Sequence, residues 1–124
     1  MSQPPSNFPV ERPILRVTDA PERQRYEARL IDTGELAALI SYQSSETWIT
    51  LLHTEVQAGF EGQGVGSQIV QGALDDARAR GLKVIPKCPF VVHWLERHPE
   101  QYDVLSHPLH GGQQPPAAGP REPA

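Results

Sequence analysis

The sequence predicts a small α/β domain of the α+β kind, with a mixed, mainly antiparallel sheet and two principal helices. Apolar and β-branched runs separated by turn residues fill the first half of the chain, which is the pattern of an antiparallel meander. A glycine-rich segment at residues 61–67 leads into a long amphipathic run, and a shorter apolar run begins after Pro89. These observations indicate a meander followed by a helix, a strand and a second helix.

The expected strands come from two-residue alternation and from turn chemistry. Apolar and charged side chains alternate through the first runs, and Asp-Thr-Gly-Glu is a typical hairpin turn. The run before the glycine-rich segment is rich in β-branched residues. The sequence therefore places strands from Ile14 onward and at residues 25–30, 36–42 and 48–56, with turns at residues 32–35 and 43–46.

The run after the glycine-rich segment has helical spacing, because its apolar residues recur three and four positions apart. Gly81 suits the left-handed position just past the end of this helix. Residues 82–85 then form a short strand parallel to residues 48–56, which completes a strand–helix–strand crossover. Pro86 lacks the N–H group that a continuing ladder needs, so we expect the two strands to part there.

Composition bounds the domain and its partners. The chain has 124 residues, a formal charge of −4 and a pI near 5.7, which argues against nucleic acid or an anionic membrane as the partner. One cysteine excludes an internal disulfide framework and a cysteine-based zinc site, and no apolar run reaches the ~18 to 20 residues of a membrane span. We expect a soluble cytoplasmic protein without a metal, in which residues 14–106 form the domain and the Pro-rich segments 1–13 and 107–124 are disordered.

The glycine-rich segment is placed to bind phosphate. A helix begins with N–H groups that have no partner in the helix, and glycines let an anion approach the main chain closely. A Walker loop is excluded because Val65 and Gly66 stand where its Lys and hydroxyl residues belong. A dinucleotide fingerprint is excluded because Ser67 stands in place of its third glycine.

The pattern Val56-x-Ala58-x-x-Glu61-x-x-Gly64-x-Gly66 before an amphipathic helix resembles the acetyl-CoA pyrophosphate motif of the GNAT superfamily of N-acetyltransferases. Over residues 23–106 the chain resembles the small YjdJ-type branch of that superfamily. Glu61 departs from the motif, which usually has Arg or Gln there. A carboxylate beside a diphosphate is mildly repulsive and would lower the affinity for CoA. The stretches that carry this second resemblance are residues 53–56, 62–67, 73–78, 88–91 and 94–100.

The resemblance implies a reduced GNAT-like fold that binds acetyl-CoA as its acetyl donor. The pantetheine arm would lie between the two parted strands and bond near Val56 like an added strand. The chain lacks the helical insertion of larger members, so its acceptor pocket should be open. The implied activity is transfer of acetyl to an amine of a small molecule, peptide or protein, and the alternative is a non-catalytic CoA-binding regulatory or interaction module. Neither the acceptor nor the oligomeric state follows from the sequence. The residues whose N–H groups would hold the diphosphate are Gly62, Gln63, Gly64, Val65, Gly66 and Ser67.

Cys88 is a candidate catalytic residue. Pro89 fits the first position of the second helix, so Cys88 is the expected N-cap residue. A thiol there faces the positive end of the helix dipole and has Lys87 beside it, and both favour the reactive thiolate. Three interpretations stay open: a nucleophile that accepts acetyl, a residue that shapes or polarises the transfer site, and a small packed side chain.

Glu55 and His53 are the candidate bases for direct transfer. An amine must lose a proton before or as it attacks a thioester, so a base within hydrogen-bond reach is useful. Both residues lie on one face of the strand at residues 48–56, and Thr54 points to the other. A structural role remains the alternative for each, with Glu55 facing solvent and His53 packed.

Overall fold

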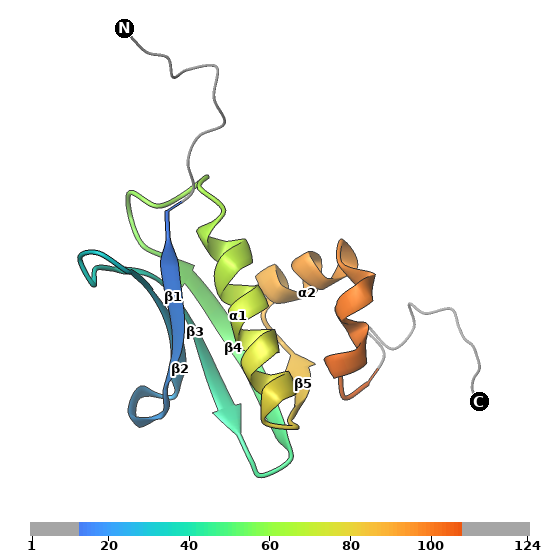
Figure 1. Ribbon diagram of the computed structural model, residues 1–124. Coiled ribbons are helices and arrows are strands. Elements are labelled where there is room, and N and C mark those ends of the chain that lie inside the picture. Colours follow the sequence, from blue (N-terminus) through green and yellow to red (C-terminus); the bar gives the residue numbers. More distant parts are fainter. Residues whose placement is uncertain (1–12, 108–124) are drawn as a thin grey trace, which may run out of the picture.

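The computed structural model describes residues 13–107, in which one sheet lies beside two helices (Figure 1). The sheet has five strands in the order β1-β2-β3-β4-β5. The first four strands are antiparallel neighbours, and β5 is parallel to β4. The elements are β1 (Leu15–Ala20), the 3₁₀ turn η2 (Pro21–Arg23), β2 (Arg25–Leu30), β3 (Leu36–Ser44), β4 (Trp48–Val56), α1 (Val65–Ala79), β5 (Lys83–Pro86), α2 (Pro89–Glu96) and the 3₁₀ turn η3 (Pro99–Val104).

The expected fold class is confirmed, with corrections at some boundaries. β3 continues to Ser44 through part of the expected second turn, because Gln43 and Ser44 pair with Thr50 and Ile49 of β4. β5 begins one residue later than expected and includes Pro86. The disorder expected for residues 1–13 and 107–124 concerns segments that lie almost wholly outside the described residues and stays a prediction.

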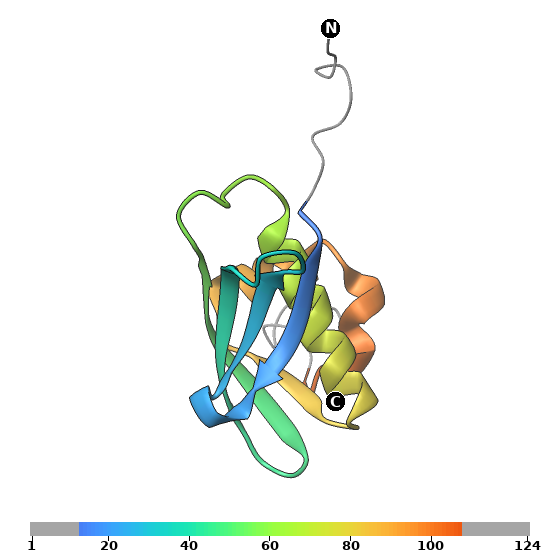
Figure 2. The ribbon, with the colours of Figure 1, turned by 60° about the vertical axis from the view of Figure 1, so that its left-hand side comes forward.

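The core lies between the sheet and the helices, which occupy the same side of the sheet in both views (Figures 1 and 2). The apolar stripe of α1 is buried, as its spacing predicts. Gly72 lets α1 approach β1 closely, because a Cβ atom at this residue would lie 2.6 Å from Cβ of Val17. The Tyr26 hydroxyl of β2 donates to Asp76 on α1 at 2.7 Å. Burial and this hydrogen bond raise the pKa of Tyr26, so the phenol stays protonated and remains a donor.

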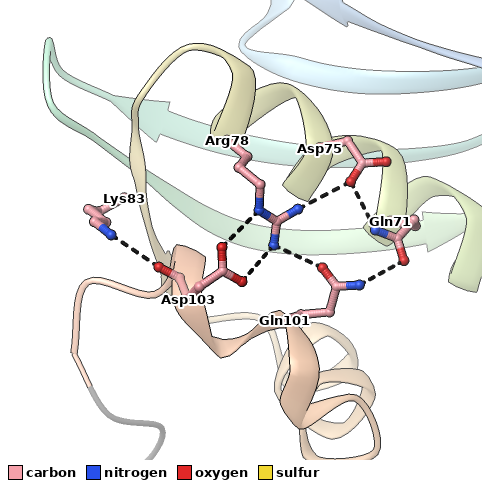
Figure 3. Close-up of polar contacts among 6 residues, drawn as sticks. All are labelled: Gln71, Asp75, Arg78, Lys83, Gln101 and Asp103. Carbon is pink, nitrogen blue, oxygen red and sulfur yellow. Dashed lines mark hydrogen bonds and ion pairs between the residues drawn. The ribbon is translucent and has the colours of Figure 1, made fainter.

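A polar network joins α1 to η3 (Figure 3). Arg78 donates to both carboxylate oxygens of Asp103 at 3.0 Å. Its Nη2 atom also donates to Gln101 at 3.0 Å, and Gln101 donates to Gln71 at 3.1 Å. The contact with Asp103 has the two-pronged geometry that fixes a guanidinium against a carboxylate. The network therefore holds the segment after α2 against the second half of α1.

No element of residues 13–107 covers the other face of the sheet, which we call the open face (Figure 2). Its central carboxylate is Glu27 on β2, which is only 4% exposed. Arg23, Arg25 and Arg29 each donate to this carboxylate at 2.8–3.1 Å. Burial alone would raise the pKa of Glu27, but the hydrogen bonds from Arg25 and Arg29 outweigh it and hold the pKa below its ordinary value. Glu27 is therefore charged in the folded protein at neutral pH.

The Glu27→Gln variant should lose about 1–2 kcal/mol of unfolding free energy at neutral pH, because it keeps the shape of the side chain and loses the charge that binds the arginines. A carboxyl group with a lowered folded pKa stabilises the fold above its unfolded pKa of about 4.3 and loses that contribution as the pH falls through the folded value. The difference between wild type and variant should thus persist down to about pH 5 and shrink below it. Urea unfolding at several pH values measures it.

Glu55→Gln provides a control on the same face, since its side chain is 53% exposed. It should change the unfolding free energy by less than about 0.5 kcal/mol. Equal effects of the two substitutions would contradict the structural role given to Glu27.

Candidate functional site

The β4–β5 ladder stops at Pro86, as the sequence predicts. Its last pair is Leu51 with Pro86. The N–H groups of Lys87 and Cys88 then both donate to the Leu51 carbonyl, at 2.9 and 3.0 Å. The chain thus turns away from β4 into α2, and the second half of β4 has no β5 partner. We call the space along this edge of β4 the strand gap.

The main chain of Val56 faces the strand gap. The N–H group of Gln57 donates to Ala37 on the β3 side at 2.8 Å. Main-chain groups of successive strand residues point to alternate sides, so those of Val56 and Thr54 point away from β3. A register shift at Leu52, which lies between the paired residues Leu51 and His53, bends β4 just before this edge begins.

The glycine-rich loop leads from the strand gap to α1. Gly59, Gly62 and Gly64 all have positive φ angles, of 93°, 76° and 77°. Glu61 accepts a hydrogen bond from the Gly59 N–H at 3.0 Å, and Gln63 donates to the Gly59 carbonyl at 3.0 Å. The side chains of Glu61 and Gln63 therefore stabilise the loop through hydrogen bonds to its own main chain. This second role of Glu61 is absent from the sequence interpretation, because a carboxylate two residues from a glycine has no distinctive pattern.

The loop ends at Gly64, the N-cap residue of α1, which has no side-chain cap. Gln68 is the first residue whose N–H reaches a carbonyl of this turn, that of Gly64 at 3.1 Å. The N–H groups of Val65, Gly66 and Ser67 therefore have no partner within the helix. Together with the positive φ glycines before them, these groups form a main-chain surface suited to an anion.

Gly66 has a packing role besides. A Cβ atom at Gly66 would lie 2.5 Å from Cζ of Phe90, so the phenyl ring of α2 rests on the first turn of α1. Phe90 is 40% exposed, whereas Val91, Trp94 and Leu95 of the same apolar run are buried. Ser67 accepts a hydrogen bond from the Trp94 indole at 2.8 Å.

Cys88 is the N-cap residue of α2, as predicted, and is only 2% exposed. Its Sγ atom lies 3.2 Å from the Thr54 hydroxyl of β4. The two side chains meet across the strand gap, next to the last pair of the ladder. Thr54 is a site residue that the sequence interpretation misses, although the period of two already places it opposite to its neighbours.

His53 and Glu55 lie on the other side of β4, on the open face. Their Nε2 and Oε2 atoms are 3.4 Å apart, and their side chains are 63% and 53% exposed. The predicted shared strand face is thus confirmed, and the packed alternative for His53 is wrong. The structure brings these two residues together and keeps them apart from Cys88, with Thr54 between them in the chain.

Within residues 13–107, no three His, Cys, Asp or Glu side chains gather into a possible metal-binding group. None of the helices described in this range has the length and apolarity needed to cross a bilayer.

Comparison with known proteins shows a family model and a solved structure to which the chain is similar. The family model described as GCN5-related N-acetyl-transferase matches residues 25–105. A solution structure of a GCN5-like candidate N-acetyltransferase from Staphylococcus aureus is 26% identical and superposes with a TM-score of 0.56, over 80% of this chain and 95% of that one. No curated protein sequence matches. The superfamily and fold predicted from the sequence are confirmed, whereas the YjdJ-type branch stays a prediction.

The Gly66→Ala substitution should fall short of the roughly 0.5–1 kcal/mol by which alanine in place of glycine ordinarily stabilises a helix, because the new methyl group has to displace the Phe90 ring. In a Phe90→Ala background the ring is gone, and Gly66→Ala should give the full stabilisation. Chemical denaturation of the four proteins of this cycle measures the coupling, and additive effects would contradict the contact.

Proposed function

The chain belongs to the GCN5-related N-acetyltransferase family, and from this membership we propose that it transfers acetyl from acetyl-CoA to an amine of a small molecule, peptide or protein. The observation that carries the proposal is the parting of β4 from β5 directly before the glycine-rich loop. A free strand edge and a main-chain anion surface in sequence suit a ligand with an amide-bearing arm and a diphosphate.

The donor would occupy the loop and the strand gap. The N–H groups of residues 62–67 are the proposed diphosphate ligands, since Gly62 and Gly64 have the left-handed conformation in which successive main-chain N–H groups can form a concave anion site. The amides of the pantetheine arm would pair with the edge of β4 at Val56. The Glu61 carboxylate adds repulsion, although its bond to Gly59 engages one of its oxygens within the loop.

Direct transfer is the chemistry that the exposed side of β4 supports. The amine nitrogen attacks the thioester carbonyl carbon, and Glu55 or His53 takes the proton that the nitrogen loses. The carbon–sulfur bond then breaks, and the departing thiolate of CoA takes up a proton. The Nε2 atom of His53 and the Oε2 atom of Glu55 lie 3.4 Å apart, and both side chains are open to an acceptor from solvent.

The buried position of Cys88 favours a positioning role over a nucleophilic one. A nucleophile must reach the acyl carbon of the donor. Cys88 is only 2% exposed, and its thiol is within hydrogen-bond distance of the Thr54 hydroxyl, so its access to a ligand is restricted. The pair instead ties the start of α2 to β4 where the strand gap begins. The nucleophile would require a second thioester, formed on Cys88 and then broken by the amine, and the direct route needs no such step.

Binding of the donor is tested by calorimetry with acetyl-CoA, desulfo-CoA and ATP. Wild type should bind both CoA species more tightly than ATP. The Gly64→Val variant should lose at least about tenfold in affinity for the CoA species, because a β-branched residue resists the φ angle of 77° at the start of α1. Gly81→Val is the matched control, since Gly81 has a φ angle of 71° just past the end of α1, at the other end of this helix from the loop. Equal affinity of a folded Gly64→Val protein and wild type would show that the donor site is misplaced.

Turnover separates the catalytic alternatives. Acetyl-CoA consumption with an amine and peptide panel should fall by about 10²-fold or more in Glu55→Gln if this carboxylate is the base. Cys88→Ala should keep most activity under direct transfer, and loss of acetylation in both Cys88→Ala and Cys88→Ser with CoA binding retained would assign the nucleophilic role instead. CoA binding by wild type without turnover of any amine would identify the non-catalytic CoA-binding module.

A further inference from the structure

The candidate bases share the open face with paired residues of β2 and β3. The side chains of these bases and of the residues paired with them lie on the face away from the helices, because the residues that alternate with them point towards the helices. Tyr26 donates a hydrogen bond to α1, and the Thr54 hydroxyl contacts Cys88 Sγ. Cross-strand pairing then aligns the outward residues. Two such rows cross the face, Arg25–Ser41–His53 and Glu27–Leu39–Glu55.

Positive charge gathers at the far end of these rows, although the whole chain carries a net charge of −4. Arg23, Arg25 and Arg29 surround the single carboxylate of Glu27, which can offset only one of their charges. Arg16 on β1 pairs with Arg29 across the ladder, is exposed, and makes no ion pair with another described residue. A ligand that reaches this end of the face therefore meets an excess of guanidinium groups.

The shape of the face favours an extended ligand. Small ligands are usually enclosed by concave pockets, whereas a sheet face presents parallel rows of side chains. A cavity of about 500 Å³ does exist beside the loop, but none of its lining residues belongs to β4. An amine held there would depend on groups other than His53 and Glu55. The cavity is lined by Pro13, Ile14, Leu30, Ile31, Asp32, Phe60 and Gln63.

We propose that the acceptor is an acidic peptide segment, whose amine lies at His53 and Glu55 and whose carboxylates bind Arg16, Arg25 and Arg29 across the open face. This inference rests on the proposed acetyl transfer and names its substrate class. The peptide crosses the strands, with its amine at β4 and its acidic side chains over β2 and β1. Leu39 lies between the two ends but is only 8% exposed, so the charged groups at the two ends carry the recognition.

The strand spacing sets where the acidic residues belong. Neighbouring strands lie about 4.8 Å apart, so β2 is about 10 Å and β1 about 14 Å from β4. An extended peptide advances about 3.3 Å per residue. Acidic side chains should therefore matter most at roughly three to five residues from the acetylated amine.

The test uses the full chain, acetyl-CoA and peptides that differ only at these positions. A peptide with a free N-terminal amine and Asp or Glu at positions four to six should be acetylated with a kcat/KM at least about fivefold above its Asn or Gln counterpart, and still further above its Lys counterpart. The advantage should shrink as the salt concentration is raised from 50 to 500 mM, because the screening length then falls from about 13 Å to about 4 Å and the attraction between exposed charges weakens. A small acidic amine, such as an amino dicarboxylic acid, is the comparison substrate that carries the negative charge without a peptide chain.

Two charge reversals sharpen the test. Arg16→Glu should reduce the preference for the acidic peptide by about three- to tenfold and improve the basic one, because Arg16 contacts only the acceptor in this scheme. Arg97→Glu, at the end of α2 on the helix side, makes the same change in net charge and should leave the preference unchanged. Anisotropy of a labelled acidic peptide gives a second readout that needs no turnover.

Each outcome is decisive. Equal kcat/KM for acidic and neutral peptides, equal effects of Arg16→Glu and Arg97→Glu, or a better small acidic amine would overturn the acidic peptide while acetyl transfer stands. A self-associated chain that Arg16→Glu dissociates would assign the face to a second copy and would also overturn it. If no amine is acetylated, the proposed function fails, and peptide anisotropy alone still decides whether the open face selects acidic segments.

Discussion

The arrangement of the candidate site depends on the parting of β4 from β5. Pro86 has no N–H group to donate to a continuing ladder, and the N–H groups of Lys87 and Cys88 both donate to the carbonyl of Leu51. This leaves the outer edge of β4 free just before the chain enters the glycine-rich loop. The same strand then serves three environments: its edge faces the strand gap, Thr54 faces Cys88, and His53 with Glu55 faces solvent.

Much of this arrangement follows from local patterns in the sequence. The period of two identifies β4 and separates Thr54 from His53 and Glu55, and the helical period identifies the buried face of α1. Single residues with distinctive backbone preferences mark the boundaries: Gly81 adopts a φ angle of 71° after α1, and Pro89 opens α2 with Cys88 at its cap. Such signals are readable because each acts through its own backbone or its nearest neighbours.

Contacts between distant parts of the chain are what the sequence leaves undetermined. Arg78 and Asp103 are ordinary charged residues until folding brings α1 and η3 together. Glu27 alternates as an outward residue, yet three arginines cover it so that it is nearly inaccessible. Phe90 belongs to the apolar run of α2, yet its ring lies against Gly66 of α1 and stays 40% exposed. Each depends on a partner whose position is set by the whole fold.

The contact between Trp94 and Ser67 has a spectroscopic consequence. The indole N–H donates to a hydroxyl on the first turn of α1, and the indole ring stacks on His98 with 3.9 Å between centroids. The chain has only one other tryptophan, Trp48 at the start of β4, which is 37% exposed. The buried indole therefore makes an intrinsic fluorophore whose emission reports on the first turn of α1, so movement of the loop can be followed without attaching a dye.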